Sequence, residues 1–145
     1  MTPSLANPDF CRLARCLIAE GMNVRLKARG HSMQPWIRAG DLITVAPSDP
    51  AQLKRGDVIV FESAAGRLII HRLVAVRAGE AGLTFVTRGD AGAANDPPFG
   101  VGRIVGRVIE VWRGGRRVRA NGPAYLWRAA FRRRLMAVWR LARPG

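Results

Sequence analysis

The middle of the chain consists of short runs of β-branched and other apolar residues, separated by turn-forming residues. Gly-Asp pairs favour turns because glycine tolerates positive φ and aspartate bonds to nearby backbone. They recur at 40–41, 56–57 and 89–90. The apolar runs are LITVA (42–46), VIVF (58–61), RLIIHRLVAV (67–76), LTFVT (83–87) and RIVGRVIEVW (103–112). Such runs, with no helical segment between them, predict a mainly β fold: a coiled, partly closed antiparallel structure.

The N-terminal part of the chain predicts one helix and one further strand. Apolar residues recur at helical spacing from Phe10 to about Glu20, and Asp9 is a candidate N-cap. NVRLKAR (23–29) then alternates apolar and basic residues, as a half-exposed strand does. We therefore expect an N-terminal helix within residues 1–22 and a β-domain over residues 23–120.

Residues 121–145 predict a basic amphipathic helix within the same single domain. NGP (121–123) interrupts the chain, and residues 124–142 then place an apolar stripe opposite arginines. Two interpretations remain open. The helix packs on the sheet, or it lies in an anionic membrane interface with its tryptophans at headgroup level. The residues that would contact a membrane are Trp127, Arg132, Arg133, Arg134, Trp139 and Arg140.

The positive charge is concentrated at the C-terminal end. The formal net charge is +14, yet all ten acidic residues lie at or before Glu110. From Trp112 onward there are ten arginines and no acidic residue. A charge distribution of this kind favours a polyanionic partner, such as phospholipid headgroups, nucleic acid or an acidic protein.

Cysteine spacing and hydropathy favour a particular cellular compartment for the chain. Cys11 and Cys16 are five residues apart in a helical stretch, which predicts reduced packing residues and no zinc signature. No run reaches the roughly 18 apolar residues of a spanning helix, and no signal peptide is visible. We expect a cytoplasmic location, with peripheral attachment to the inner membrane face as an alternative, and neither a metal nor a cofactor.

Ser32 is the first candidate for chemistry. It lies in RGHSMQPW (29–36), where glycine and proline are typical of an ordinary turn. Ser32 is a nucleophile only if a base and an orienting acid lie elsewhere in the chain. The adjacent His31 is poorly placed as that base, because neighbouring side chains on an extended chain point apart.

His71 is the other candidate base. It lies inside the predicted strand LIIHRLV, where a histidine is more often a packed residue than a catalyst. Two aspartates, Asp90 and Asp96, follow in the polar segment TRGDAGAANDPPFG (87–100). Either they cap a solvated loop through Asx turns, or one of them orients His71 while the other braces the loop.

Four segments of the chain resemble, in order, the sequence boxes of signal peptidase I, in the S24/S26 peptidase superfamily. They are GHSMQPWIRAGDLITV, LKRGDVIVF, LIIHRLVAV and TRGDAGAANDPP, and the resemblance spans about residues 23–111. It is closest to the archaeal, endoplasmic-reticulum and sporulation-type branch, which uses serine and histidine. Lys27 and Lys54, the two lysines, lie outside the strand expected to carry the base. Unlike most of its relatives, the chain shows no membrane anchor.

The resemblance implies a role for each candidate residue. Box by box, Ser32 corresponds to the nucleophile, His71 to the general base and Asp96 to the acid that completes the triad. Asp90 corresponds to the loop aspartate of the same box. The implied fold is a coiled, mostly antiparallel β-structure with a substrate groove.

The resemblance also indicates an altered oxyanion site. Gly30 stands where many relatives have a serine hydroxyl, so the backbone N–H of Ser32 becomes the main candidate donor. Met33 and Pro35 are expected to make the nucleophile turn rigid and to line the groove.

The predicted function is that of a serine endopeptidase that cleaves a leader or signal peptide through an acyl-enzyme. The alternative is a non-enzymatic or regulatory nucleic-acid-binding β-domain related to repressor peptidases. Nucleic acid is the weaker prediction, because roughly 30 residues before Ser32 leave no room for a helix-turn-helix. A catalytically silent relative that presents peptides to a partner is a third possibility.

Overall fold

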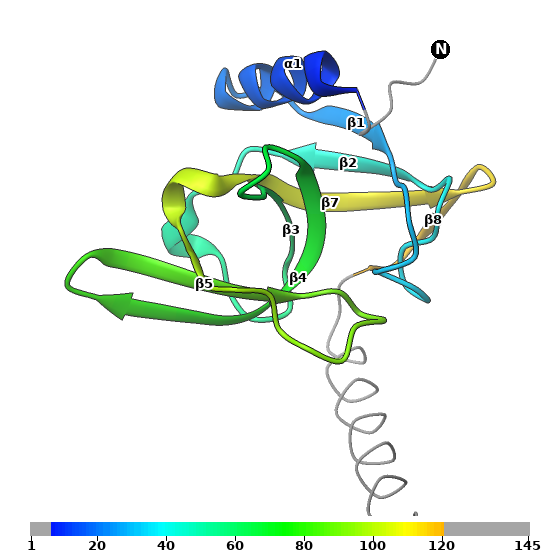
Figure 1. Cartoon of the computed structure of the whole chain (residues 1–145). Coiled ribbons are helices and arrows are strands. Elements are labelled where there is room, and N and C mark those ends of the chain that lie inside the picture. The colour runs from blue at the N-terminus through cyan, green and yellow to red at the C-terminus, as the bar shows by residue number, and fades with distance from the viewer. Residues whose placement is uncertain (1–6, 121–145) are drawn as a thin grey trace, which may run out of the picture.

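The computed structural model describes residues 7–120 as one strongly curled antiparallel sheet with a helix on one side (Figure 1). The eight-stranded sheet has the order β1-β2-β7-β3-β4-β5-β6, and β8 pairs with β7. The strands are β1 (Val24–Lys27), β2 (Leu42–Ala46), β3 (Val58–Glu62), β4 (Leu68–Gly79), β5 (Gly82–Arg88), β6 (Phe99–Gly100), β7 (Ile104–Arg113) and β8 (Arg116–Val118). The predicted mainly β, partly closed antiparallel fold is confirmed.

Every predicted strand is present, and two short strands were missed. β8 follows the pair Gly114 and Gly115, both at positive φ, which is a typical signal for a tight hairpin turn. β6 has only two residues, of which Phe99 pairs with Phe85 of β5. Segments this short carry no periodicity, so their pairing depends on neighbouring strands. Two single-turn 3₁₀ helices, Pro50–Gln52 and Val101–Arg103, complete the described elements.

Helix α1 (Pro8–Ala19) begins earlier than the sequence predicts. Its N-cap is Asn7, whose Oδ1 accepts hydrogen bonds from the backbone N–H groups of Asp9 and Phe10. The prediction that Asp9 caps the helix is therefore wrong. Asp9 lies instead in the first turn, where its carboxylate interacts favourably with the helix dipole. The reason is Pro8, which suits the first helical position because its missing N–H is not needed there.

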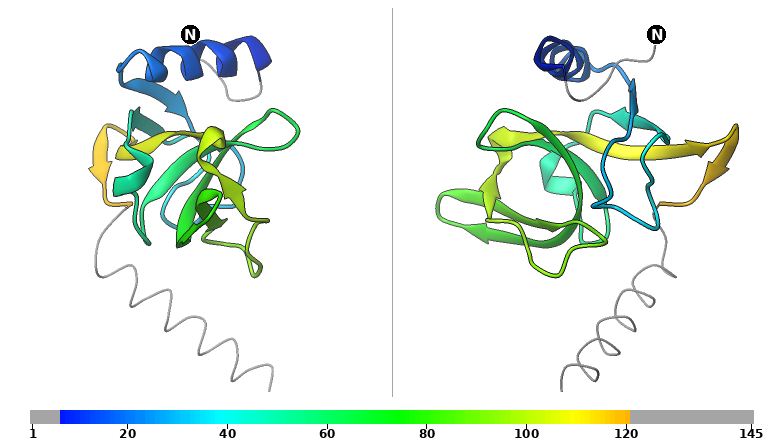
Figure 2. Two further views of the ribbon diagram at one scale, coloured as in Figure 1. Left: turned by 90° about the vertical axis from the view of Figure 1, so that its left-hand side faces the viewer. Right: turned by 45° about the vertical axis from the view of Figure 1, so that its right-hand side comes forward.

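One face of α1 packs against the β1 end of the sheet, and both views in Figure 2 show the helix on that side only. The buried residues of this face are Cys11, Ala14 and Ile18. Cys16 is exposed, so the predicted packing role holds for Cys11 and is wrong for Cys16. Neither cysteine forms a disulfide.

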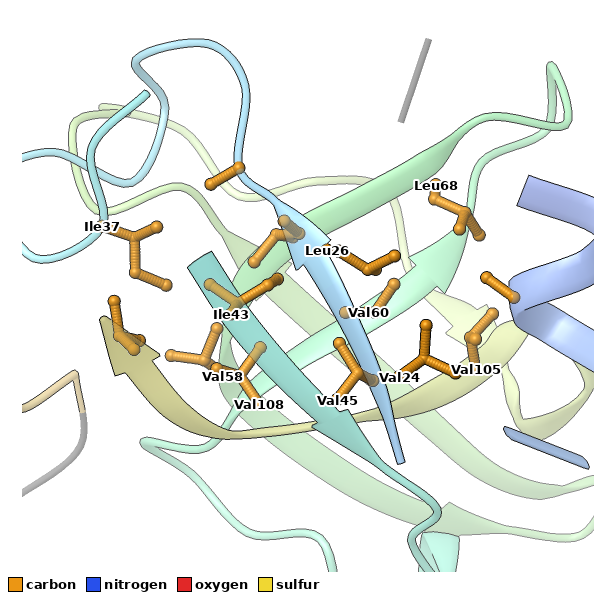
Figure 3. Close-up of a cluster of buried hydrophobic side chains, with 14 of the residues drawn as sticks. Val24, Leu26, Ile37, Ile43, Val45, Val58, Val60, Leu68, Val105 and Val108 are labelled. Atoms are coloured by element: carbon orange, nitrogen blue, oxygen red, sulfur yellow. The ribbon is translucent and has the colours of Figure 1, made fainter. Parts of the chain in front are cut away.

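The core lies on both faces of β3. Val58 and Val60 belong to a large cluster with β1, β2, β7 and α1, part of which is shown in Figure 3. Ile59 and Phe61 point to the opposite face and join a smaller cluster built around Phe85. Each buried side chain of this size contributes roughly 1.5–3 kcal/mol. Burial on both faces explains why this strand is a continuous apolar run rather than an alternating one.

Gly106 of β7 allows the sheet to curl. A Cβ at this position would lie 2.6 Å from the carbonyl oxygen of Ala46 and 2.8 Å from Cγ1 of Val45. The pairing of β7 with β3 also shifts register directly beside it, and the pairing with β2 shifts register at Ile109 of the same strand. Close backbone approach and such irregularities are the means by which strands bend a sheet.

The predicted C-terminal helix and its proposed membrane contacts lie outside the described residues. The division into segments 1–22, 23–120 and 121–145 therefore stays a prediction. Within residues 7–120, no helix has the length and apolar character needed to cross a membrane.

Candidate active site

Ser32 lies on an exposed loop between β1 and β2 that two buried side chains hold in place. Met33 and Ile37 are 4% and 2% exposed, and the backbone N–H of Ile37 donates to the Met33 carbonyl at 2.9 Å. The loop is thus anchored in the core directly after Ser32. Met33 also lines the groove beside Ser32.

A second anchor ties the far end of this loop to β7. Arg113 donates two hydrogen bonds to Asp41, at 2.9 and 2.8 Å, and a third to the carbonyl of Trp36 at 3.2 Å. The hydrogen bond to the Asp41 carboxylate raises the pKa of Arg113. Asp41 also accepts from the backbone N–H of Arg38 at 2.8 Å. The loop that carries Ser32 is therefore held by the core directly after Ser32 and by β7 at its far end.

His71 lies on β4 with Asp96 at one ring nitrogen. Nδ1 of His71 is 2.5 Å from Oδ2 of Asp96, and their side chains are 16% and 29% exposed. An ionised carboxylate can only accept, so Nδ1–H donates. In the neutral ring, Nε2 is then left as a proton acceptor. The ring also packs near Phe61 in an edge-to-face arrangement, with the ring centroids 6.2 Å apart.

Thr87, at the end of β5, fixes Asp96 in turn. Its hydroxyl donates to Oδ2 of Asp96 at 2.7 Å, and its carbonyl accepts from the backbone N–H of Asp96 at 2.8 Å. Thr87 is completely buried. The carboxylate of Asp96 is thereby held by the sheet, although the residue itself belongs to a loop. Thr87 lies in the polar segment 87–100 that the sequence analysis considers. A polar side chain alone, however, does not identify a residue as part of a site.

Ser32 and His71 both lie close to Gly89. A Cβ built on Gly89 would lie 3.1 Å from Cβ of Ser32 and 3.2 Å from Nε2 of His71. It would also lie 2.6 Å from the Ser32 carbonyl oxygen, which accepts a hydrogen bond from the backbone N–H of Ala91. Only a residue without a side chain fits between the serine and the histidine. The sequence identifies this glycine as part of a turn and gives no sign of the contact.

Asp90 belongs to a different network. Both of its oxygens accept from Arg72 at 2.9 Å, and the two side chains are 2% and 3% exposed. Arg72 also donates to the carbonyls of Gly56 and Ala120, both at 2.8 Å. His71 and Arg72 are neighbours on β4, and successive strand side chains point to opposite faces. The two aspartates therefore bind side chains on opposite faces of β4: Asp96 binds His71 and Asp90 binds Arg72.

The remaining candidates occupy the surroundings of Ser32. Gly30 has a φ of 75° and lines the groove, so a side chain there would be strained. Pro35 is exposed and, unlike Met33, is not among the groove-lining residues. Nδ1 of His31 is 2.8 Å from the Gln34 amide nitrogen, which places the ring in a local contact on the exposed loop.

A groove of about 560 Å³ runs alongside Ser32 and His71. One wall is the loop from Ala28 to Arg38, the other is the segment from Ala65 to His71, and Pro8 and Cys11 of α1 lie at its side. Among residues 7–120, no group of three His, Cys, Asp or Glu side chains is arranged to hold a metal ion.

The curled antiparallel half-barrel with one N-terminal helix is consistent with the fold of one peptidase family. The family model described as Peptidase S24-like matches residues 4–84, more than half of the chain. The chain therefore belongs to the Peptidase S24-like family. The matched region includes Ser32 and His71 and ends before the loop that carries Asp90 and Asp96.

A curated relative supports membership of the same peptidase superfamily over a shorter region. Signal peptidase I W of Bacillus subtilis (strain 168) is 39% identical over 66 residues, which make up 45% of this chain. The match spans about a third of that relative, 35% of its length. The superfamily predicted from the sequence is therefore supported. The S24 family also includes repressors, so membership alone does not establish peptidase chemistry.

Proposed function

We propose that this protein is a serine endopeptidase in which Ser32 is the nucleophile, His71 the general base and Asp96 the acid that orients it. One observation carries the proposal: Asp96 holds Nδ1 of His71, while Nε2 of His71 and Cβ of Ser32 both lie within 3.2 Å of one point beside Gly89. A carboxylate, an imidazole and a serine in this spatial order are the groups that serine activation by an imidazole requires.

The reaction follows from these positions. Oγ of Ser32 attacks the carbonyl carbon of the scissile peptide bond as Nε2 of His71 accepts its proton. His71 then returns the proton to the leaving amine, the C–N bond breaks, and an ester to Ser32 remains. A water molecule, deprotonated by the same nitrogen, attacks the ester and releases the acid and the free serine.

The negative oxygen of each tetrahedral intermediate needs a fixed donor, worth roughly 3 kcal/mol of barrier. The backbone N–H of Ser32 is suited to this role, because it makes no hydrogen bond to any described residue. Gly30 offers no hydroxyl to assist it. The oxyanion site of this protein thus depends on backbone donors.

The substrate is best proposed as an extended peptide. On one edge, residues 68–72 of β4 pair with β3, whereas pairing with β5 on the other edge begins only at Arg72. This leaves an open strand edge along the groove wall, and an extended peptide can add to such an edge. A leader or signal peptide fits this description, and one relative bears the name Signal peptidase I W.

An active-site-directed fluorophosphonate tests the proposal. We expect the wild-type protein to be labelled, and Ser32→Ala to lose labelling completely because the attacking oxygen is absent. We expect His71→Ala to label at least about 100-fold more slowly, because the base is lost. His31→Ala is the matched control and should label normally.

Two outcomes would contradict the proposal. Labelling that survives Ser32→Ala would mean that another residue reacts. A wild-type protein that is folded yet unlabelled would favour the regulatory, nucleic-acid-binding alternative. The net charge of +14 is the observation on which that alternative rests.

A further inference from the structure

The groove beside Ser32 is lined by arginines and by no acidic side chain. Arg29 and Arg38 lie on the wall that carries Ser32, and Arg67 lies on the opposite wall. All three residues are exposed, and their guanidinium groups form no hydrogen bond or ion pair with any residue in the range 7–120. Their charges are therefore available to a ligand.

The carboxylates next to this groove are already engaged: Asp41 pairs with Arg113, and Asp96 holds His71. Glu62 lies next to Gly66 of the groove wall, with Oε1 3.9 Å from the position of a Cβ there. Its carboxylate is already paired with Arg15 of α1. With respect to residues 7–120, the groove thus keeps three unpaired positive charges around Ser32.

We propose that the substrate of this groove is a peptide with acidic residues on either side of the bond that Ser32 attacks. This inference rests on the proposed function of the same groove. Opposite charges placed along a binding groove favour complementary partners and reject like-charged ones.

The spacing along β4 predicts where an acidic residue lies. Arg67 precedes His71 by four residues, and a strand rises about 3.3 Å per residue, so the two are separated by roughly 13 Å along the strand. A peptide that pairs with the open edge of β4 lies alongside the strand and has the same rise per residue. Its acidic residue would therefore lie about four positions from the scissile bond.

The groove suits a peptide better than a nucleic acid. Its walls include the apolar side chains of Met33, Ile37, Leu68 and Ile70, all of which are largely buried. An apolar floor next to an open strand edge accommodates alternate side chains of an extended peptide. Binding of single-stranded nucleic acid would instead favour aromatic platforms, and no aromatic ring other than His71 lines the groove within the described residues.

Binding can be tested apart from catalysis with the inert variant Ser32→Ala. Three rhodamine-labelled ten-residue peptides share a central Ala-Ala and differ only four positions away on each side, where they carry Glu, Gln or Lys. In fluorescence anisotropy we expect the Glu peptide to bind roughly five- to tenfold more tightly than the Gln peptide, and the Lys peptide to bind most weakly. The difference should shrink in 0.5 M NaCl, because salt screens exposed charges.

Matched variants assign the effect to the groove. In the Ser32→Ala background, Arg67→Gln should remove most of the Glu preference, and Arg29→Gln and Arg38→Gln should each reduce it. Arg25→Gln and Arg77→Gln remove exposed arginines that lie outside the groove and should leave the preference unchanged.

Several results would overturn the inference. These are equal binding of the Glu and Gln peptides, no measurable binding of any peptide, a preference that persists in Arg67→Gln, and tighter binding of a 20-nucleotide oligo-dT than of the Glu peptide. A Glu preference in a wild-type protein that fluorophosphonate does not label would support the acidic-peptide groove and refute the peptidase. Fluorophosphonate labelling of a protein that shows no charge preference would support the peptidase and refute the acidic-peptide groove.

Discussion

At the scale of the residue, the hydrogen bonds of His71 distinguish the two aspartates of the loop after β5. The residue pattern left open whether Asp90 or Asp96 orients the histidine, and the resemblance to signal peptidase I favoured Asp96. In the structure, Asp96 contacts Nδ1 of His71, whereas Asp90 is occupied by Arg72. The two roles separate because His71 and Arg72 are consecutive on a strand and point to opposite faces.

Asp96→Asn should therefore slow the chemistry and spare the fold. We expect fluorophosphonate labelling to fall by about 10²–10⁴-fold, because the amide favours the tautomer with its proton on Nε2. The Thr87 hydroxyl can accept from the Asn amide that replaces Oδ2, so urea unfolding should show little change in the free energy of unfolding. Labelling at the wild-type rate would mean that another acid orients His71.

At the scale of the element, Arg72 of β4 connects distant parts of the chain. Its guanidinium holds Asp90 in the loop after β5, Gly56 before β3 and Ala120 at the end of the described chain. Breaking one partner of a buried ion pair costs far more than the pair contributes, because a buried charge is left unpaired.

Asp90→Asn should consequently act on stability. We expect the free energy of unfolding to fall by about 3–5 kcal/mol, because Arg72 keeps its charge and loses its counter-ion. Urea denaturation followed by circular dichroism measures the change. Glu80→Gln, which removes an exposed carboxylate, is the control and should be neutral. A neutral Asp90→Asn would show that the other contacts of Arg72 suffice.

At the scale of the whole molecule, the curl of the sheet brings β4, β5 and the Ser32 loop together. β7 takes part by pairing with both β2 and β3, and Gly106 permits the close approach of its backbone to Ala46. Arg113, at the end of the same strand, holds the loop that carries Ser32. One central strand thus links the curvature of the sheet to the position of Ser32.

Gly106→Ala should disturb this arrangement. The new methyl group would lie 2.6 Å from a carbonyl oxygen, so the strands must separate. We expect a loss of roughly 1–3 kcal/mol in the free energy of unfolding, as for other overpacked sites. Gly102→Ala, where no atom lies within 4 Å of the new Cβ, is the control in the same urea experiment. An equal effect of the two substitutions would contradict a special role for Gly106.

The structure also shows which residues no local pattern could reveal. Thr87 looks like an ordinary strand residue and Gly89 like an ordinary turn glycine, yet one holds Asp96 and the other separates Ser32 from His71. Their importance comes from residues more than ten positions away or from the fold of a loop. Arg113 is a similar case, since its partner Asp41 is 72 residues distant.

The sequence by itself determined the set of long strands and the types of residue available for chemistry. Apolar periodicity and turn residues are local properties, so LITVA, VIVF and LIIHRLV could be recognised as strands without any knowledge of their partners. Only the tertiary structure decided which aspartate meets His71, how β6 and β8 pair, and that three arginines share a groove with Ser32. These depend on strand register and on the curl of the sheet, which arise from contacts between residues far apart in the chain.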